Sequence, residues 1–138
     1  MKISANSRYA LRFLIQLSAA NGRLTTMSIA RVEGISEKML ERIAAKLKHA
    51  GIVRSIKGLG GGYELAFPAD QIKTSDILLL METPYLPLHC TEDYSHCQNA
   101  GDCVLLPLFQ QIDSAIKSVT ESVTISDLLQ SKQKPYQL

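Results

Sequence analysis

Three cysteines lie within fourteen residues of the 138-residue chain, at Cys90, Cys97 and Cys103, and the sequence has no others. Six residues separate the first two and five separate the last two. Three thiols cannot all pair with one another as disulfides, and thiolate sulfurs at short loop spacing suit zinc or an iron–sulfur cluster. This cysteine segment, residues 90–103, therefore predicts a metal site or a redox-active site.

A site with three thiolate ligands needs a fourth donor. His96, beside Cys97, is the nearest imidazole and is the candidate fourth ligand. A residue of a partner subunit or an external thiol would also serve, and the other donors in or near the segment are His89, Glu92, Asp93 and Asp102. Zinc usually binds a closely spaced Cys-x-x-Cys pair, which this sequence lacks, so a cluster is the first hypothesis and zinc is the alternative.

Helices are expected to position this segment. The first helix is predicted from about residue 8 to residue 20, with Ser7 as its N-cap and apolar residues at helical spacing. A second, short helix is predicted to begin at Thr25 or Thr26 and to stop at Gly34, because glycine readily adopts the left-handed conformation that ends a helix.

A third helix is predicted from residue 37 to residue 50, with Ser36 as its N-cap. One face is apolar, and basic residues with two glutamates lie on the remaining faces; the apolar stripe is Leu40, Ile43, Ala44 and Leu47. Two helices joined by a sharp turn that contains glycine form the helix-turn-helix arrangement.

Two short strands follow, because the apolar period changes from helical to alternating in residues 52–57 and 63–67. The glycine-rich stretch Gly58–Gly62 joins them, so the pair is predicted to form a β-hairpin, the wing of a winged helix. Glycines allow backbone to approach a phosphate, and Arg54 and Lys57 would flank that approach. No Gly-Lys-Ser/Thr sequence follows, so a nucleotide-hydrolysing phosphate loop is not indicated.

The charge is distributed unevenly between the two halves of the chain. Residues 1–67 carry 11 basic and 4 acidic side chains, a net charge of +7, whereas residues 68–138 carry 4 and 9, a net charge of −5. The first half is therefore suited to meet a polyanion such as DNA, although a basic surface that is only solvated is the alternative interpretation.

Beyond the wing, Thr74 or Ser75 is predicted to cap a short helix that ends at Glu82. Residues 104–119 carry a strong apolar stripe of period 3.6 and predict a long helix. We expect this stripe to pack against a second copy of the chain, and packing onto its own domain is the alternative. A capping box at Thr124–Asp127 predicts a last short helix.

These elements predict a mainly α fold with a small β-hairpin wing: a winged helix-turn-helix domain plus a long dimerisation helix. The expected divisions are a DNA-binding region in residues 1–68, a connecting helix and cysteine-rich cluster-binding loop in 69–103, and a dimerisation helix with a short C-terminal helix in 104–138. The longest apolar run, residues 77–81, is far shorter than the roughly 20 residues of a membrane span. The N-terminus lacks an apolar signal core, so a cytoplasmic location is expected. The sequence shows neither a nucleophile with an adjacent base nor a carboxylate pair, so an enzyme is not expected.

The chain resembles the Rrf2 family of small bacterial winged-helix regulators, which includes IscR-, NsrR- and CymR-type proteins. The cysteine segment before a long helix is one part of the resemblance; the others are Ser7–Arg12, Ile29–Ser36, Leu40–Glu41, Leu47–Val53, Gly58–Tyr63 and Val123–Leu129. The resemblance covers nearly the whole chain and implies a homodimer that places its recognition helices in successive major grooves of a palindromic double-stranded DNA operator. Glu41 matches the recognition-helix glutamate of the family, and Lys57 takes the place of a wing arginine.

A carboxylate accepts from cytosine N4, and lysine or arginine donates to guanine or to phosphate. Taken together, the positions carried over from the resemblance and this chemistry give the residues expected at DNA: Arg8, Ser36, Glu37, Lys38, Met39, Glu41, Arg42, Lys46, Arg54, Lys57, Gly60 and Gly61.

The resemblance also implies a 2Fe-2S or a 4Fe-4S cluster, through which a repressor would sense iron–sulfur status, redox state or nitric oxide. The family's fourth-ligand positions are occupied by Leu106 and Arg8 in this chain, and neither side chain is a ligand of that kind. Two alternative functions remain: the same DNA-binding fold with a zinc site or a thiol-based redox switch, and a helical interaction module that does not bind DNA.

Overall fold

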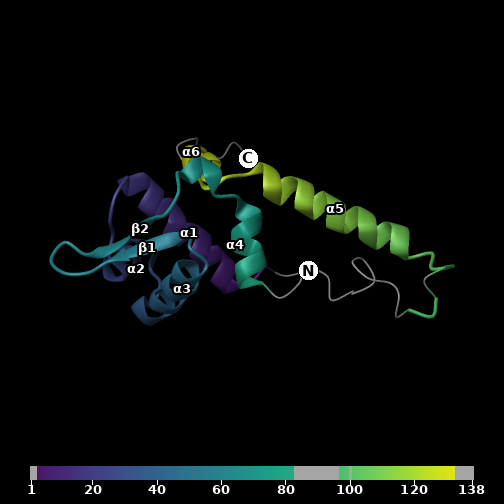
Figure 1. Ribbon diagram of the computed structural model, residues 1–138, viewed down its shortest axis with the longest axis horizontal. Helices are drawn as coiled ribbons and strands as arrows, with labels where there is room; N and C mark the ends of the chain where they lie inside the picture. The colour runs from purple at the N-terminus through teal and green to yellow at the C-terminus, as the bar shows by residue number, and fades with distance from the viewer. Residues whose placement is uncertain (1–2, 83–96, 100, 133–138) are drawn as a thin grey trace.

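The computed structural model describes residues 3–82, 97–99 and 101–132 (Figure 1). The predicted class is confirmed, since the described elements are helices and one two-stranded antiparallel hairpin. In order they are α1 (Ala5–Ala20), α2 (Thr26–Glu33), α3 (Glu37–His49), β1 (Val53–Ile56), β2 (Gly62–Leu65), the 3-10 turn η1 (Ala69–Gln71), α4 (Thr74–Met81), α5 (Leu106–Ser122) and α6 (Ile125–Lys132).

None of the helices in the described part of the chain is long and apolar enough to cross a membrane.

Helix α1 lies at the centre of the body, and α2, α3, α4, α6 and β2 pack against it (Figure 1). Its apolar face is completely buried, because Phe13 and Leu14 have no exposed surface. The ring of Phe13 meets that of Tyr63 on β2 edge to face, with centroids 5.9 Å apart, which fastens the wing to α1. Around this face lie Leu40, Ile43, Ala44, Leu47, Val53, Ile72, Ile77, Met81 and Ile125.

The ends of α2 agree with the prediction. The hydroxyl of Thr25 accepts a hydrogen bond from the backbone N–H of Ser28, and Gly34 ends the helix with φ at 64°. Helix α3 begins at Glu37 as expected, with Ser36 in the N-cap position, but the hydroxyl of Ser36 makes no capping hydrogen bond.

Two predicted caps are wrong, and in both cases the hydroxyl instead forms a hydrogen bond with a residue far away in the sequence. Ser4, not Ser7, caps α1, and Ser7 is fully buried inside the helix, where its hydroxyl donates to Glu82. Lys73 occupies the N-cap position of α4, and Thr74 is already inside that helix, with its hydroxyl donating to the carbonyl of Thr120 at 2.8 Å.

The wing is an antiparallel hairpin in which Val53 pairs with Leu65 and Ile56 pairs with Gly62. It is joined to the loop before α2 by two backbone hydrogen bonds: Leu24 N–H donates to the Tyr63 carbonyl at 3.0 Å, and Tyr63 N–H donates to the Leu24 carbonyl at 2.8 Å. Gly62, with φ at 144°, lies so close to this loop that a Cβ atom would stand 2.6 Å from the Leu24 carbonyl oxygen. The wing is therefore fixed to the loop before α2 at the tip end of β2.

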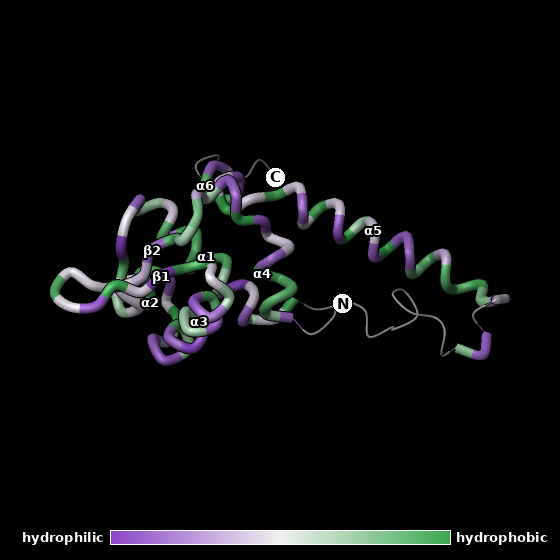
Figure 2. Tube along the Cα trace, in the orientation of Figure 1, coloured by the Kyte–Doolittle hydropathy of each residue, from purple (hydrophilic) through white to green (hydrophobic). Residues whose placement is uncertain are grey.

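Helix α5 extends away from the body (Figure 1), and none of its residues is buried. It begins at Leu106, two residues later than predicted, because the Leu106 N–H first closes a turn onto the carbonyl of Cys103. Pro107 occupies its first turn as expected. Hydrophobic and hydrophilic residues alternate along its length (Figure 2), and the side chains of Leu105, Leu108 and Val119 are more than half exposed.

After α5 the chain returns to the body. The predicted capping box is confirmed, since the N–H of Thr124 donates to the Asp127 carboxylate at 2.8 Å and the N–H of Asp127 donates to the Thr124 hydroxyl at 3.2 Å. The Thr124 hydroxyl and N–H hold the pKa of Asp127 below its ordinary value. Ile125, the first residue of α6, is fully buried against the core.

Two segments far apart in the sequence meet where the chain leaves and re-enters the body. Thr74 N–H donates to the Val123 carbonyl at 2.9 Å, and Ile125 N–H donates to the Ile72 carbonyl at 3.0 Å. We call these paired segments, residues 72–74 and 123–125, the junction. The division expected at residue 68 stays a prediction, and the core of the body includes Ile72, Ile77 and Ile125 beyond it.

Candidate functional site

The outward face of α3 is a charged surface that has no ion-pair partner among the residues that the structure describes. The helix buries Leu40 and Leu47, so its 3.6-residue period turns the charged positions to solvent. The exposed side chains on this face include Lys38, Glu41, Arg42 and Lys46. Among the described residues none of these four makes an ion pair or a side-chain hydrogen bond, so their charges are available to an external ligand.

The remaining expected contacts on this part of the chain differ in exposure. Ser36 is exposed, whereas Glu37 and Met39 are half-buried, and Met39 packs against the core. Met39 is thus partly committed to packing. Arg8, from α1, is exposed.

A small hollow of about 20 Å³ connects α3 with the ends of two other helices. Arg42 and Lys46 line it from α3, Asn6 lines it from the first turn of α1, and Met81 lines it from the last turn of α4. The charged face of α3 therefore lies beside the point where the chain leaves α4 toward the cysteine segment.

Glu82 fastens the same point to α1. Its carboxylate oxygen Oε1 accepts from the Ser7 hydroxyl at 2.6 Å and from the Ser4 N–H at 2.7 Å. The Ser7 hydrogen bond is the main reason that the pKa of Glu82 lies below its ordinary value, and the opposing effect of burial is smaller. The sequence predicted no role for Glu82, because Ser7 and Glu82 are 75 residues apart and neither belongs to a shared motif.

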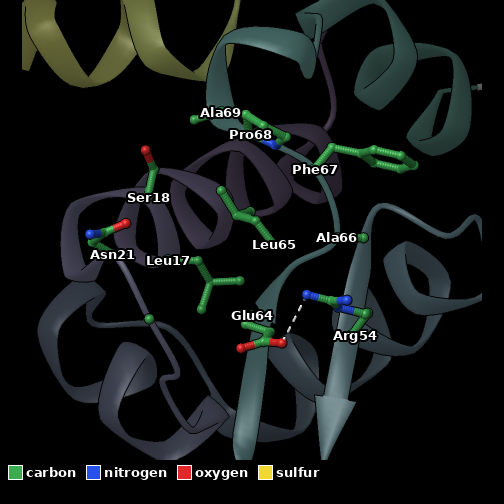
Figure 3. Close-up of a pocket in the computed structure, with 11 residues that line it drawn as sticks. Leu17, Ser18, Asn21, Arg54, Glu64, Leu65, Ala66, Phe67, Pro68 and Ala69 are labelled. Atoms are coloured by element: carbon green, nitrogen blue, oxygen red, sulfur yellow. Dashed lines mark ion pairs between the residues drawn. The ribbon is translucent and has the colours of Figure 1, made fainter.

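The two cations expected on the wing, Arg54 and Lys57, differ in their ion-pair partners. Arg54 lies opposite Glu64 in the hairpin, and the Arg54 Nη2 atom is 3.1 Å from the Glu64 Oε1 atom. Figure 3 shows this pair at an open hollow of about 360 Å³ that is also lined by Ser18 and Asn21 of α1 and its cap. Lys57, at the wing tip, is exposed and has no ion-pair partner among the described residues.

Two glycines of the wing tip were expected at DNA. Gly60 is exposed with φ at 73°, a conformation that favours glycine. At Gly61 a Cβ atom would stand 2.5 Å from the Ile56 carbonyl oxygen, and the Gly61 N–H donates to the Gly58 carbonyl at 2.9 Å. The tip is therefore a tight turn in which residue 61 has no room for a side chain.

Two of the three cysteines lie in the described part of the chain. Cys97 is exposed, Cys103 is half-exposed, and both are free thiols. Cys90 and His96 lie outside the described residues. Within the described residues no three His, Cys, Asp or Glu side chains gather into a metal site. The described donor chemistry, two accessible thiol sulfurs just before α5, fits iron or zinc.

Comparisons with known proteins agree with this arrangement. A family model named Rrf2 and described as an iron-dependent transcriptional regulator matches residues 3–131. The chain is 36% identical over 130 residues to the HTH-type transcriptional regulator CymR of Bacillus subtilis (strain 168), and the match covers 93% of this chain and 89% of that protein.

Solved structures show the same fold. The structure of CymR (YrzC), described as the global cysteine regulator of B. subtilis, superposes with a TM-score of 0.76 at 33% identity and covers 95% of this chain and 98% of that one. T. potens IscR also superposes with a TM-score of 0.76, at 29% identity, over 100% of this chain and 94% of that one.

Proposed function

The chain belongs to the Rrf2 family of transcriptional regulators, and from this premise we propose that it is a homodimeric repressor whose cysteine segment controls its binding to operator DNA. The observation that carries the proposal is the charged face of α3. It stands over a rigid buried stripe, it has no partners among the described residues, and the wing is fixed beside it.

The chemistry of this face suits base-edge and phosphate contacts. Lys38 and Arg42 donate to guanine or to phosphate, and Glu41 accepts from cytosine N4. Lys57 brings a further cation from the wing tip. Since recognition helices of a dimer lie about 34 Å apart on a palindromic operator, the separation of the two copies decides how well both bind at once.

Dimerisation is proposed through α5. A helix that buries none of its own residues and exposes Leu108, Ile112 and Val119 requires a partner for its apolar stripe. A second copy of the same helix supplies a matching stripe, and a two-fold axis makes the contact self-complementary.

The sensing role is proposed for Cys90, Cys97 and Cys103, which would hold an iron–sulfur cluster with a fourth donor still to be identified. Such a cluster supplies oxidation-sensitive and nitric-oxide-sensitive iron–thiolate chemistry when it is bound. The contribution of the chain is positional. The segment lies between α4 and α5. Met81, the last residue of α4, lies beside Arg42, and Glu82, which follows it, accepts a hydrogen bond from the Ser7 hydroxyl.

A thiol-based switch without a cluster, or a zinc site, is the second candidate. The exposure of Cys97 supports it, as does the similarity to a protein described as a global cysteine regulator.

The DNA-binding half of the proposal is tested by fluorescence anisotropy with a duplex selected by the wild-type protein from a random-sequence library. Each phosphate contact contributes about 0.9 to the slope of log K against log salt, so a steep slope is expected. Arg42→Ala should weaken binding by about 1 to 3 kcal/mol, whereas Lys73→Ala, an equal charge change at the junction, should not. A weak affinity for DNA that does not change with salt concentration would favour an interaction module whose function is not DNA binding.

The sensing half is tested by anaerobic purification followed by iron, sulfide and zinc analysis. Cys97→Ser and Cys103→Ser should each lower the metal content, and Asn99→Ala, between them, is the matched control. Stoichiometric zinc in a colourless protein would replace the cluster hypothesis with the zinc site. Absence of both metals, together with DNA binding that depends on thiol oxidation, would favour the thiol switch.

A further inference from the structure

Arg23 lies beside the wing tip although it belongs to the loop between α1 and α2. Its neighbour Leu24 exchanges two backbone hydrogen bonds with Tyr63 of β2. A Cβ atom at Gly62 would stand 2.6 Å from the Leu24 carbonyl oxygen, so the loop and the tip end of β2 are in close backbone contact. Arg23, the residue before Leu24, is therefore held next to the wing.

The guanidinium of Arg23 reaches the tip itself. Its Nη1 atom donates to the Gly60 carbonyl oxygen at 3.4 Å, in an exposed position. A guanidinium has five N–H donors arranged as a planar fork, so this one hydrogen bond leaves the others available. The bond holds the guanidinium at the wing tip in a solvent-exposed position.

Arg54, the arginine of the wing itself, already has an acidic partner. Arg54 pairs with Glu64 across the hairpin, with 3.1 Å between the charged atoms (Figure 3). The unpaired positive charge near the tip, among the described residues, comes from Lys57 and from Arg23. Leu59, in the tip itself, is completely exposed and adds no charge.

We propose that Arg23 is an additional DNA contact, in which its guanidinium binds a backbone phosphate beside the wing tip while it donates to the Gly60 carbonyl. The inference rests on the proposed DNA-binding function. A planar fork binds phosphate and a backbone carbonyl at the same time, which a single ammonium group does less well.

The test compares three variants on the duplex selected by the wild-type protein. Arg23→Gln keeps a donor for the Gly60 carbonyl but removes the charge, whereas Arg23→Lys keeps the charge. We expect Arg23→Gln to reduce the slope of log K against log salt by about 1, and Arg23→Lys to retain the wild-type slope with weaker affinity. Lys73→Ala, at the junction, is the control for charge loss and should keep both the slope and the affinity.

The outcomes separate the two proposals. If the wild-type protein selects no duplex and its binding has no salt dependence, the proposed function fails. If the wild-type protein binds with a steep slope and Arg23→Gln keeps that slope, then Arg23 only supports the wing and the inference is overturned. Thermal unfolding of each variant checks that the body is intact, because an exposed hydrogen bond at 3.4 Å should contribute little to its stability.

Discussion

At the scale of single residues, Glu82 is a carboxylate whose ionisation joins the end of α4 to the first turn of α1. The Ser7 hydroxyl and the Ser4 N–H stabilise its charged form and lower its pKa. Because the folded pKa is lower than the unfolded value of about 4.3, this stabilisation is complete above that value and is lost as the pH falls through the folded pKa.

Glu82→Gln should therefore reduce the free energy of unfolding by about 1 kcal/mol at neutral pH, with allowance for solvent screening of a half-exposed group. The difference from wild type should shrink as the pH falls through the folded pKa, because both proteins are then neutral at this position. Chemical denaturation at a series of pH values measures it. Asp76→Asn, an exposed carboxylate on the same helix, is the control, and a difference that is constant with pH would contradict the assignment.

At the scale of elements, the wing tip depends on the absence of a side chain at residue 61. Gly61→Ala would place a Cβ atom 2.5 Å from the Ile56 carbonyl oxygen, so the tip must change its conformation. We expect weaker DNA binding, measured by anisotropy, with little change in the melting temperature of the body. Gly22→Ala is the matched control, since its Cβ would meet only the Ala20 carbonyl, at 3.7 Å. If Gly61→Ala bound DNA with the wild-type affinity, the conformation of the wing tip would not contribute to DNA binding.

Helix α5 offers a second test at this scale. Ile112→Glu puts a charge in the apolar stripe, whereas Gln111→Glu puts the same charge one position away, on an exposed polar residue. Burial of an unpaired carboxylate in the proposed dimer should weaken association at least tenfold, or about 1.4 kcal/mol. Sedimentation equilibrium should detect monomers for Ile112→Glu and dimers for Gln111→Glu. Equal masses for the two variants would exclude this face as the dimer contact.

Local patterns predicted the elements well, and contacts between distant residues account for the differences. The stops at Gly34 and the capping box at Thr124 depend on neighbours within a few residues, so the sequence displays them. Ser7 and Thr74 look like ordinary caps, but their hydroxyls bond to groups 75 and 46 residues away, and no local pattern signals such partners. The pairing of Arg54 with Glu64 was equally hidden, since it required the register of the hairpin.

At the scale of the whole molecule, the C-terminal helix is part of the body that carries α3. Ile125 is fully buried against the core, although it lies beyond the projecting helix α5. Ile125→Ala should lower the free energy of unfolding by about 2 to 5 kcal/mol, since it leaves a cavity in the core. Val119→Ala, whose side chain is 63% exposed, should have a small effect on the stability of the monomer.

Denaturant titration of both variants at low protein concentration measures the difference. If the two variants were equally stable, α6 would not be a structural part of the body. The same packing predicts that a fragment ending at residue 68 would lack part of its core, because Ile72, Ile77 and Ile125 would be missing from it.

The junction has a mechanical consequence. Its backbone hydrogen bonds hold residues 72–74 against residues 123–125, so the start of α4 and the end of α5 share one fixed pivot. Helix α5 has 17 residues and is therefore a rigid arm of about 25 Å. A rotation of about 5° at the pivot would displace its far end, next to Cys103, by about 2 Å. If the proposed sensing function moves the Cys103 end of this arm by about 2 Å, the arm would turn by only about 5° at the junction, where α4 begins and packs against α1.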